Sequence, residues 1–303
     1  MSGRVFDVRA AGATLRLGER PWLMGIVNAS PDSFSDGGLH RGLEAQVELA
    51  RELLAAGADI LDIGGESAST GRDPVEVREE TARVVPLIER VAGELGATVS
   101  VDTYKPQVAR AAVGAGASII NDVSGLRDPG LADVCAESGA ALVLMHTRAA
   151  PRVRLQDPDL YGDITSEVMA FLSERSRVAL ERGVAPDQLI LDPGPDFTKT
   201  PAQTIRLLSE VDRLHELGRP LLMAISRKDF IGALTGRAPR ERGAGTLAAL
   251  AYGVEHGAHI FRLHDIAAAS DFLAVRAALD GENEPGRDLA LGDEIRYDRV
   301  TAD

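Results

Sequence analysis

Residues 99–122 read VSVDTYKPQVARAAVGAGASIIND, and they contain the structural unit that decides the fold. An aliphatic run at 99–101 is followed by a segment of helical period at 105–115, by Gly116 and by a second aliphatic run at 118–120. Glycine is common just past the last turn of a helix, where the chain needs a positive φ. The stretch therefore predicts two parallel strands joined by a helix.

The same unit recurs along the chain. Aliphatic runs of strand length lie at 22–27, 60–63, 99–101, 118–120, 141–145, 189–191, 221–225 and 260–263. Segments of helical period lie between them, at 43–55, 75–95, 105–115, 130–138, 165–182, 201–217 and 245–256. Many of these segments end in a glycine just before the next strand: Gly57, Gly96, Gly116, Gly139, Gly183, Gly218 and Gly257. Eight strands alternating with helices predict either a closed barrel or an open doubly wound sheet.

The residues after the first strand favour the closed barrel. An open dinucleotide-binding sheet carries a glycine-rich turn at that point, but this chain reads Asn28-Ala29-Ser30-Pro31. We therefore predict an α/β fold, a (β/α)8 TIM barrel over residues 21–281. A β-hairpin over residues 1–20 is expected before it, because apolar and polar residues alternate there, and an acidic tail over residues 282–303 after it.

Composition excludes several classes of protein. The net charge of −13 argues against nucleic-acid binding, which needs a basic surface. No apolar run reaches the roughly 18 residues that span a membrane, and the first ten residues show no signal-peptide pattern. The single cysteine, Cys135, is expected to be a small buried hydrophobe. A cytoplasmic enzyme is the resulting expectation.

Polar residues end every predicted strand, on the face where TIM barrels carry their active sites. They are Asn28, Asp62, Asp102, Asn121 and Asp122, His146 after Met145, Asp192, Ser226-Arg227-Lys228, and Arg262 with His264 and Asp265. A ring of carboxylates needs partners, so we expect Asp62, Asp122 and Asp265 to serve the scaffold. The others are candidates for ligand binding.

Four of these candidates suit a flat, nitrogen-rich heterocycle. The carboxylates of Asp102 and Asp192 can accept N–H groups from an amino-pyrimidine edge, and the amide of Asn121 offers both a donor and an acceptor. Lys228 adds a donor for a ring carbonyl or nitrogen. These types of side chain at one rim predict a heterocycle-binding pocket.

Three further candidates suit a diphosphate with a metal ion. Arg262 and His264 are cationic or donor groups of the kind that bind phosphate. The amide oxygen of Asn28 is a suitable ligand for Mg²⁺, which takes few protein ligands beside phosphate and water. Two loops, 28–38 with Phe34 and the small-residue loop 64–71, are placed to close over a substrate.

The motifs at these strand ends resemble the dihydropteroate synthase family from about residue 22 to residue 279. They read GIVNASPDSFSDGG at 25–38, DIGGES at 62–67, SVDT at 100–103, IND at 120–122, LMH at 144–146, LDPG at 191–194, SRK at 226–228, GT at 245–246 and RLH at 262–264. Each motif alone is weak evidence. Their order, one for each strand end, makes the resemblance specific.

The resemblance implies condensation of a 6-hydroxymethyl-7,8-dihydropterin diphosphate with p-aminobenzoate, with Mg²⁺, in a homodimer. Pterin binding then falls to Asp102, Asn121, Met145, Asp192 and Lys228. Diphosphate binding falls to Asn28, Arg262 and His264, with Asn28 also holding the metal. The acceptor site is lined by Phe34, Phe197, Ser226, Ser69 and Thr70, and the residues implied as catalytic are Asp102, Lys228, Arg262 and His264.

This sequence departs from the family pattern on the acceptor side. Ala68, Ser69 and Thr70 stand where the family usually has Thr, Arg and Pro, and Asp196 stands where it usually has Gly. Two alternatives therefore remain open beside an active synthase. One is a synthase-like pterin-binding paralogue with another acceptor or little activity. The other is a methyltetrahydrofolate-binding methyltransferase or a non-catalytic folate binder, against which the SRK motif and the long 28–38 loop argue.

Overall fold

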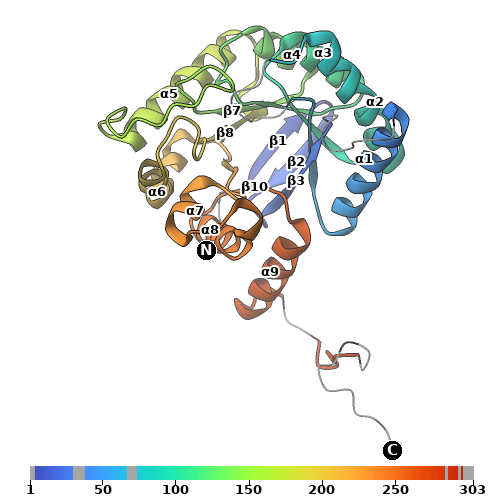
Figure 1. Cartoon of the computed structure of the whole chain (residues 1–303), viewed down its shortest axis with the longest axis vertical. Helices are drawn as coiled ribbons and strands as arrows, with labels where there is room; N and C mark the ends of the chain where they lie inside the picture. The colour runs from blue at the N-terminus through green and yellow to red at the C-terminus, as the bar shows by residue number, and fades with distance from the viewer. Residues whose placement is uncertain (1–3, 30–37, 67–73, 284–285, 293–294, 296–303) are drawn as a thin grey trace, which may run out of the picture.

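Eight parallel strands form a barrel in the computed structural model, which describes residues 4–29, 38–66, 74–283, 286–292 and 295 (Figure 1). Their order around the barrel is β8-β7-β6-β5-β4-β3-β10-β9. A parallel bridge between Leu191 and Leu221 joins the two ends of this sheet. The strands are β3 (Trp22–Asn28), β4 (Ile60–Gly64), β5 (Thr98–Asp102), β6 (Ile119–Asp122), β7 (Ala141–Met145), β8 (Leu189–Asp192), β9 (Leu222–Met223) and β10 (Ile260–Leu263). The predicted TIM barrel is confirmed.

Helices surround the barrel as an outer ring (Figure 1). They are α1 (Gly38–Ala55), α2 (Val77–Leu95), α3 (Pro106–Gly114), α4 (Gly130–Ser138), α5 (Ile164–Glu181), α6 (Pro201–Ser209), α7 (Asp229–Thr235), α8 (Gly243–Glu255) and α9 (Ile266–Leu279), with short 3₁₀ turns η2 (Pro186–Gln188), η3 (Val211–Leu217) and η4 (Pro239–Glu241). All seven glycines predicted to end helices have positive φ. Within the described parts of the chain, no helix is long and apolar enough to cross a membrane.

Burial explains why these segments form strands. Every residue of β4, β6, β7 and β8 is buried, as expected for parallel strands covered on both faces. The predicted strand at 221–225 is shorter in the structure. Only Leu222 and Met223 form β9, which pairs with β10, and Leu221 adds the bridge to Leu191. The predicted helix at 201–217 is divided into α6 and η3, because the α-helical pattern stops at Ser209. The helices α7 and α9 were not predicted.

A two-stranded hairpin covers the N-terminal end of the barrel. It consists of β1 (Phe6–Ala10) and β2 (Ala13–Leu17), which pair antiparallel. Its buried side chains pack against the lower barrel interior in one apolar cluster: Val8, Ala10, Leu15 and Leu17 with Met24, Ile60, Ile119, Val143 and Ile190. The Ala11 N–H also donates to the Gly139 carbonyl, 2.8 Å away, just before β7. Ligands must therefore approach from the opposite end of the strands.

Scaffolding roles are confirmed for two of the three acidic residues predicted to have them. Asp122 accepts backbone N–H groups from Ser124 and Leu126 in the turn after β6. Asp265 caps α9 by accepting the Ala268 N–H at 3.1 Å. Cys135 is fully buried, which raises the pKa of its thiol and confirms the prediction of a structural cysteine.

Candidate active site

Strand register brings three candidate residues to one level of the rim. Asn28 of β3 pairs with Gly64 of β4, Gly64 with Asp102 of β5, and Asp102 with Asn121 of β6. Residues opposite each other in paired strands point to the same side, so these side chains share one face. Further along the barrel, Met145 of β7 pairs with Asp192 of β8.

A buried charge network joins β4, β5, β6 and β10. The Arg262 guanidinium donates from Nε to Asp62 Oδ2 at 2.6 Å and from Nη2 to Asp102 Oδ2 at 2.9 Å. Asn121 Nδ2 donates to the same Asp62 oxygen at 3.2 Å. Arg262 was assigned to the diphosphate from the sequence. In this structure its guanidinium lies between two carboxylates and fixes their position, and it remains 22% exposed.

The carboxylates beside this network are hard to ionise. Burial raises the pKa of Asp102, and nearby Asp62 and Glu80 add to the rise while Arg262 opposes it. Burial also raises the pKa of Asp192, to about 6, although the Gly194 N–H donates to its Oδ1 at 2.7 Å. The two groups therefore titrate close to neutral pH, which is typical of functional sites.

Lys228 stands directly before α7 with its side chain against an aromatic ring. Its Nζ lies 4.4 Å from the centroid of the Phe197 ring. Burial lowers the pKa of Lys228, and the carboxylates of Asp196 and Asp192 oppose that shift. The backbone here is held by Arg242, whose Nη1 donates to the carbonyls of Arg227 at 2.9 Å and Lys228 at 3.1 Å.

Ser226 and His264 form a pair between the ends of the last two strands. The Ser226 hydroxyl lies 2.9 Å from His264 Nδ1 and accepts the His264 backbone N–H at 3.2 Å. Burial lowers the pKa of His264 to about 4, with Arg227 and Arg262 adding to the effect. The imidazole is therefore neutral at pH 7, and it can offer a hydrogen bond to a phosphate but no charge.

A buried lysine was missed by the sequence analysis. Lys199 is fully buried, and its Nζ lies 2.8 Å from His146 Nδ1, 2.8 Å from the Gly194 carbonyl and 3.0 Å from the Phe197 carbonyl. Burial lowers the pKa of Lys199 to about 7 and that of His146 to about 2. These contacts fix the loop between β8 and α6, which carries Phe197. The Phe-x-Lys spacing of the family motif was the available signal.

A cluster of polar side chains around Glu66, which the sequence did not predict, connects the loops that follow β4, β5 and β7. The Glu66 carboxylate accepts from Lys105 Nζ at 2.6 Å, Arg152 Nη1 at 3.0 Å and Tyr104 Oη at 3.1 Å. Lys105 also pairs with the buried Glu80. The residues that meet here lie 25 to 86 positions apart in sequence, so no local motif could have revealed the cluster.

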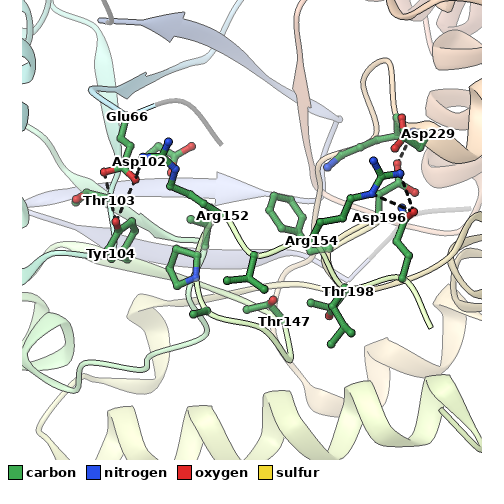
Figure 2. Close-up of a pocket in the computed structure, with 18 of the residues that line it drawn as sticks. Glu66, Asp102, Thr103, Tyr104, Thr147, Arg152, Arg154, Asp196, Thr198 and Asp229 are labelled. Carbon is green, nitrogen blue, oxygen red and sulfur yellow. Dashed lines mark hydrogen bonds and ion pairs between the residues drawn. The ribbon is translucent and has the colours of Figure 1, made fainter. Parts of the chain in front are cut away.

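A cavity of about 460 Å³ lies at the C-terminal ends of the strands, and some of these groups line it. Figure 2 shows Glu66, Asp102 and Tyr104 at one side of it and Asp196 and Asp229 at the other. Of the predicted site residues, Asp102, Phe197 and Lys228 line this cavity. Asn28, Asn121, Met145, Asp192, Ser226, Arg262 and His264 lie at neighbouring strand ends instead. Phe34, Ser69 and Thr70 lie outside the described residues.

The fold and this rim define a β/α-barrel enzyme whose site combines buried carboxylates, an amide and a lysine for a polar heterocyclic ligand. Residues 24–264 match the family described as pterin binding enzyme, and the chain belongs to that family.

Several relatives and solved structures that this chain resembles are named dihydropteroate synthase. The chain is 43% identical over 249 residues to the dihydropteroate synthase of Bacillus subtilis, covering 82% of this chain and 85% of that one. It is 40% identical to the Escherichia coli dihydropteroate synthase, with 85% and 90% covered. Among solved structures, Xanthomonas albilineans dihydropteroate synthase with 4-aminobenzoic acid has a TM-score of 0.83 at 46% identity, covering 90% and 98%. The same enzyme in complex with 7,8-dihydropteroate has a TM-score of 0.80 at 45% identity, again covering 90% and 98%.

Proposed function

We propose that this chain is a dihydropteroate synthase, a transferase of folate biosynthesis. It joins 6-hydroxymethyl-7,8-dihydropterin diphosphate to p-aminobenzoate and releases diphosphate. The observation that carries the proposal is the rim network of Asp102, Asn121 and Arg262 in a chain 45% identical to an enzyme solved with 7,8-dihydropteroate. The carboxylates of Asp102 and Asp192, at the ends of β5 and β8, suit a reaction in which positive charge develops on the pterin as the diphosphate leaves.

The test is a steady-state assay with the pterin diphosphate, p-aminobenzoate and Mg²⁺, with product identified by mass. Formation of 7,8-dihydropteroate supports the proposal. Tight pterin binding by calorimetry without condensation would contradict it and favour the paralogue with another acceptor. Methyl transfer from methyltetrahydrofolate would favour the methyltransferase.

Magnesium is proposed as the cofactor, with Asn28 as its protein ligand. Asn28 is exposed at the end of β3, level with Asp102 across Gly64. Among the residues described, no cluster of three histidine, cysteine or acidic side chains offers an all-protein metal site. This donor set fits Mg²⁺, which takes most of its ligands from water and substrate phosphate. When bound, the ion neutralises charge on the leaving diphosphate.

A pH titration tests the role of Asp192. Only its ionised carboxylate is acceptor-only towards the N–H groups of the pterin. Because burial raises the pKa of Asp192 to about 6, pterin affinity should strengthen as the pH rises through about 6. Calorimetry across this range measures the effect, and Asp192→Asn should remove the part of the pH dependence that Asp192 contributes and leave the part that Asp102 contributes. A flat profile in the unsubstituted enzyme would rule out this role for Asp192.

Restoring the family residues in the second loop tests the acceptor side. Ala68→Thr, Ser69→Arg and Thr70→Pro together should raise kcat/KM for p-aminobenzoate by about tenfold, the effect of roughly one charge-assisted hydrogen bond. The assay varies p-aminobenzoate at saturating pterin diphosphate. An unchanged or lower rate would mean that the native loop already suits its own acceptor.

A homodimer is also proposed, with the enzyme in the cytoplasm. Exposed apolar side chains on the last three helices support the dimer: Leu234 of α7, Tyr252 of α8, and Val275 and Leu279 of α9. Such side chains suit a protein–protein interface when they form one patch. Light scattering on the purified chain measures the oligomeric state.

A further inference from the structure

Asp196 has a backbone conformation that favours glycine. It lies in the loop between β8 and α6 with a φ of +66°. An L-residue with a side chain rarely adopts this region, whereas glycine enters it freely. The family usually has glycine at this position. An aspartate here has to be stabilised by contacts of its own.

The contacts of the Asp196 carboxylate connect two loops. Its Oδ1 accepts the Thr204 hydroxyl at 3.1 Å, and the same hydroxyl accepts the Asp196 backbone N–H at 3.1 Å. Its Oδ2 accepts the backbone N–H of Asp229, the first residue of α7. Lys228, at the N-cap position of α7, gives that helix no side-chain cap. Asp196 therefore caps α7 from a loop more than 30 residues away in sequence.

Both neighbours of this contact belong to the cavity. Phe197 follows Asp196, Lys228 precedes Asp229, and the lysine ammonium lies over the phenyl ring. Figure 2 shows Asp196 and Asp229 together at one side of the cavity. The charged groups that face Lys228 are the carboxylates of Asp196, Asp192 and Asp229, the guanidinium of Arg262 and the ammonium of Lys199. Asp196 makes the largest favourable contribution to the lysine's charge.

We propose that Asp196 is a positioning residue for Lys228: its carboxylate joins the β8–α6 loop to the start of α7 and so holds the lysine ammonium against the Phe197 ring. The inference rests on the proposed function only in assigning Lys228 to the pterin. A glycine can adopt this backbone conformation, but it supplies neither the hydrogen bond to the Asp229 N–H nor a negative charge near Lys228. In this chain Lys228 is thereby positioned by a contact between Asp196 and Asp229 that the usual family sequence, with glycine in place of Asp196, lacks.

Two substitutions separate the effect of the hydrogen bond to Asp229 from the effect of the negative charge. Asp196→Asn keeps the shape and can still accept the Asp229 N–H, but it loses the charge. Asp196→Gly loses both, and it places the usual family residue there, so it should fold. Asp133→Asn on α4, a partly exposed carboxylate that pairs with Arg182 away from the cavity, is the matched control for loss of one negative charge and its contacts. The readout is the calorimetric Kd of the pterin diphosphate over a range of pH, with thermal unfolding alongside.

The expected results differ between the two variants. In both, affinity should be lost at a lower pH on the alkaline side than in the unsubstituted enzyme, because removing the carboxylate lowers the pKa of Lys228 further. Asp196→Gly should also weaken binding about tenfold at neutral pH, as expected for a lost hydrogen bond to a charged group. The control should match the unsubstituted enzyme.

An unchanged Kd and an unchanged pH profile in both variants, even with a lower melting temperature, would overturn the inference and leave Asp196 a structural residue only. If the unsubstituted enzyme forms no 7,8-dihydropteroate in the condensation assay, the proposed function is overturned instead. The calorimetric comparison would still decide the role of Asp196 in that case.

Discussion

Asp102→Ala is expected to weaken binding of the pterin diphosphate by about three orders of magnitude and to abolish turnover. In the proposed complex Asp102 accepts two hydrogen bonds from the pterin, and each such bond to an ionised carboxylate contributes about 1.5–3 kcal/mol. The loss also removes one of the two carboxylates that hold Arg262, so the guanidinium is free to move within the site. Lys228→Ala should likewise abolish pterin binding, because it removes a cationic donor that lines the same cavity.

Calorimetry with the pterin diphosphate measures both variants, with circular dichroism to confirm folding. Asp102→Asn should fall between the alanine variant and the unsubstituted enzyme, because an amide keeps one acceptor oxygen. Asp133→Ala, on the outer surface, should bind normally. Retained affinity in both Asp102→Ala and Lys228→Ala would refute the assignment of the pocket.

Arg262→Met should lower the free energy of unfolding by about 3–5 kcal/mol, the range for removing one partner of a buried ion pair. The Asp62 side chain is 0% exposed and would keep only the Asn121 amide as a partner. Its other oxygen, Oδ1, already has no hydrogen-bond partner among the described residues. A methionine fills the space of the arginine stem but cannot compensate the charge.

Urea unfolding at neutral pH measures this loss. Combining Arg262→Met with Asp62→Asn should recover part of the stability, since the uncompensated charge is then gone. Arg177→Met is the control: its ion pairs with Glu174 and Glu181 are exposed, and exposed pairs contribute only about 0–1 kcal/mol. Equal losses in Arg262→Met and Arg177→Met would show that the buried network does not stabilise the fold.

The sequence predicted the barrel well because its units are local. Residues 130–138, 141–145 and 260–263 were predicted with the bounds that α4, β7 and β10 have. The helix α7 was missed because its seven residues make only two turns, too few to show a period. The helix α9 was missed because apolar residues lie on both its buried side, as at Ile266, and its exposed side, as at Val275.

The site was predictable where one residue at a strand end defines it. Asp102, Asn121 and Asp192 were found in this way, and the register places them at the rim. The partners of these residues were not predictable, because they come from distant elements: Arg262 reaches Asp62 across 200 positions, and Lys199 reaches His146 across 53. Roles that depend on such contacts need the folded chain.

The hairpin below the barrel has a consequence for how ligands arrive. Among the described residues, β1 and β2 close the lower end of the barrel, so the nearly buried Asn121 and Asp192 face ligands that come from the rim. Phe197 and Lys228 line the space on the rim side. Any ligand that contacts Asn121 and Asp192 therefore enters and leaves from the same side of the barrel.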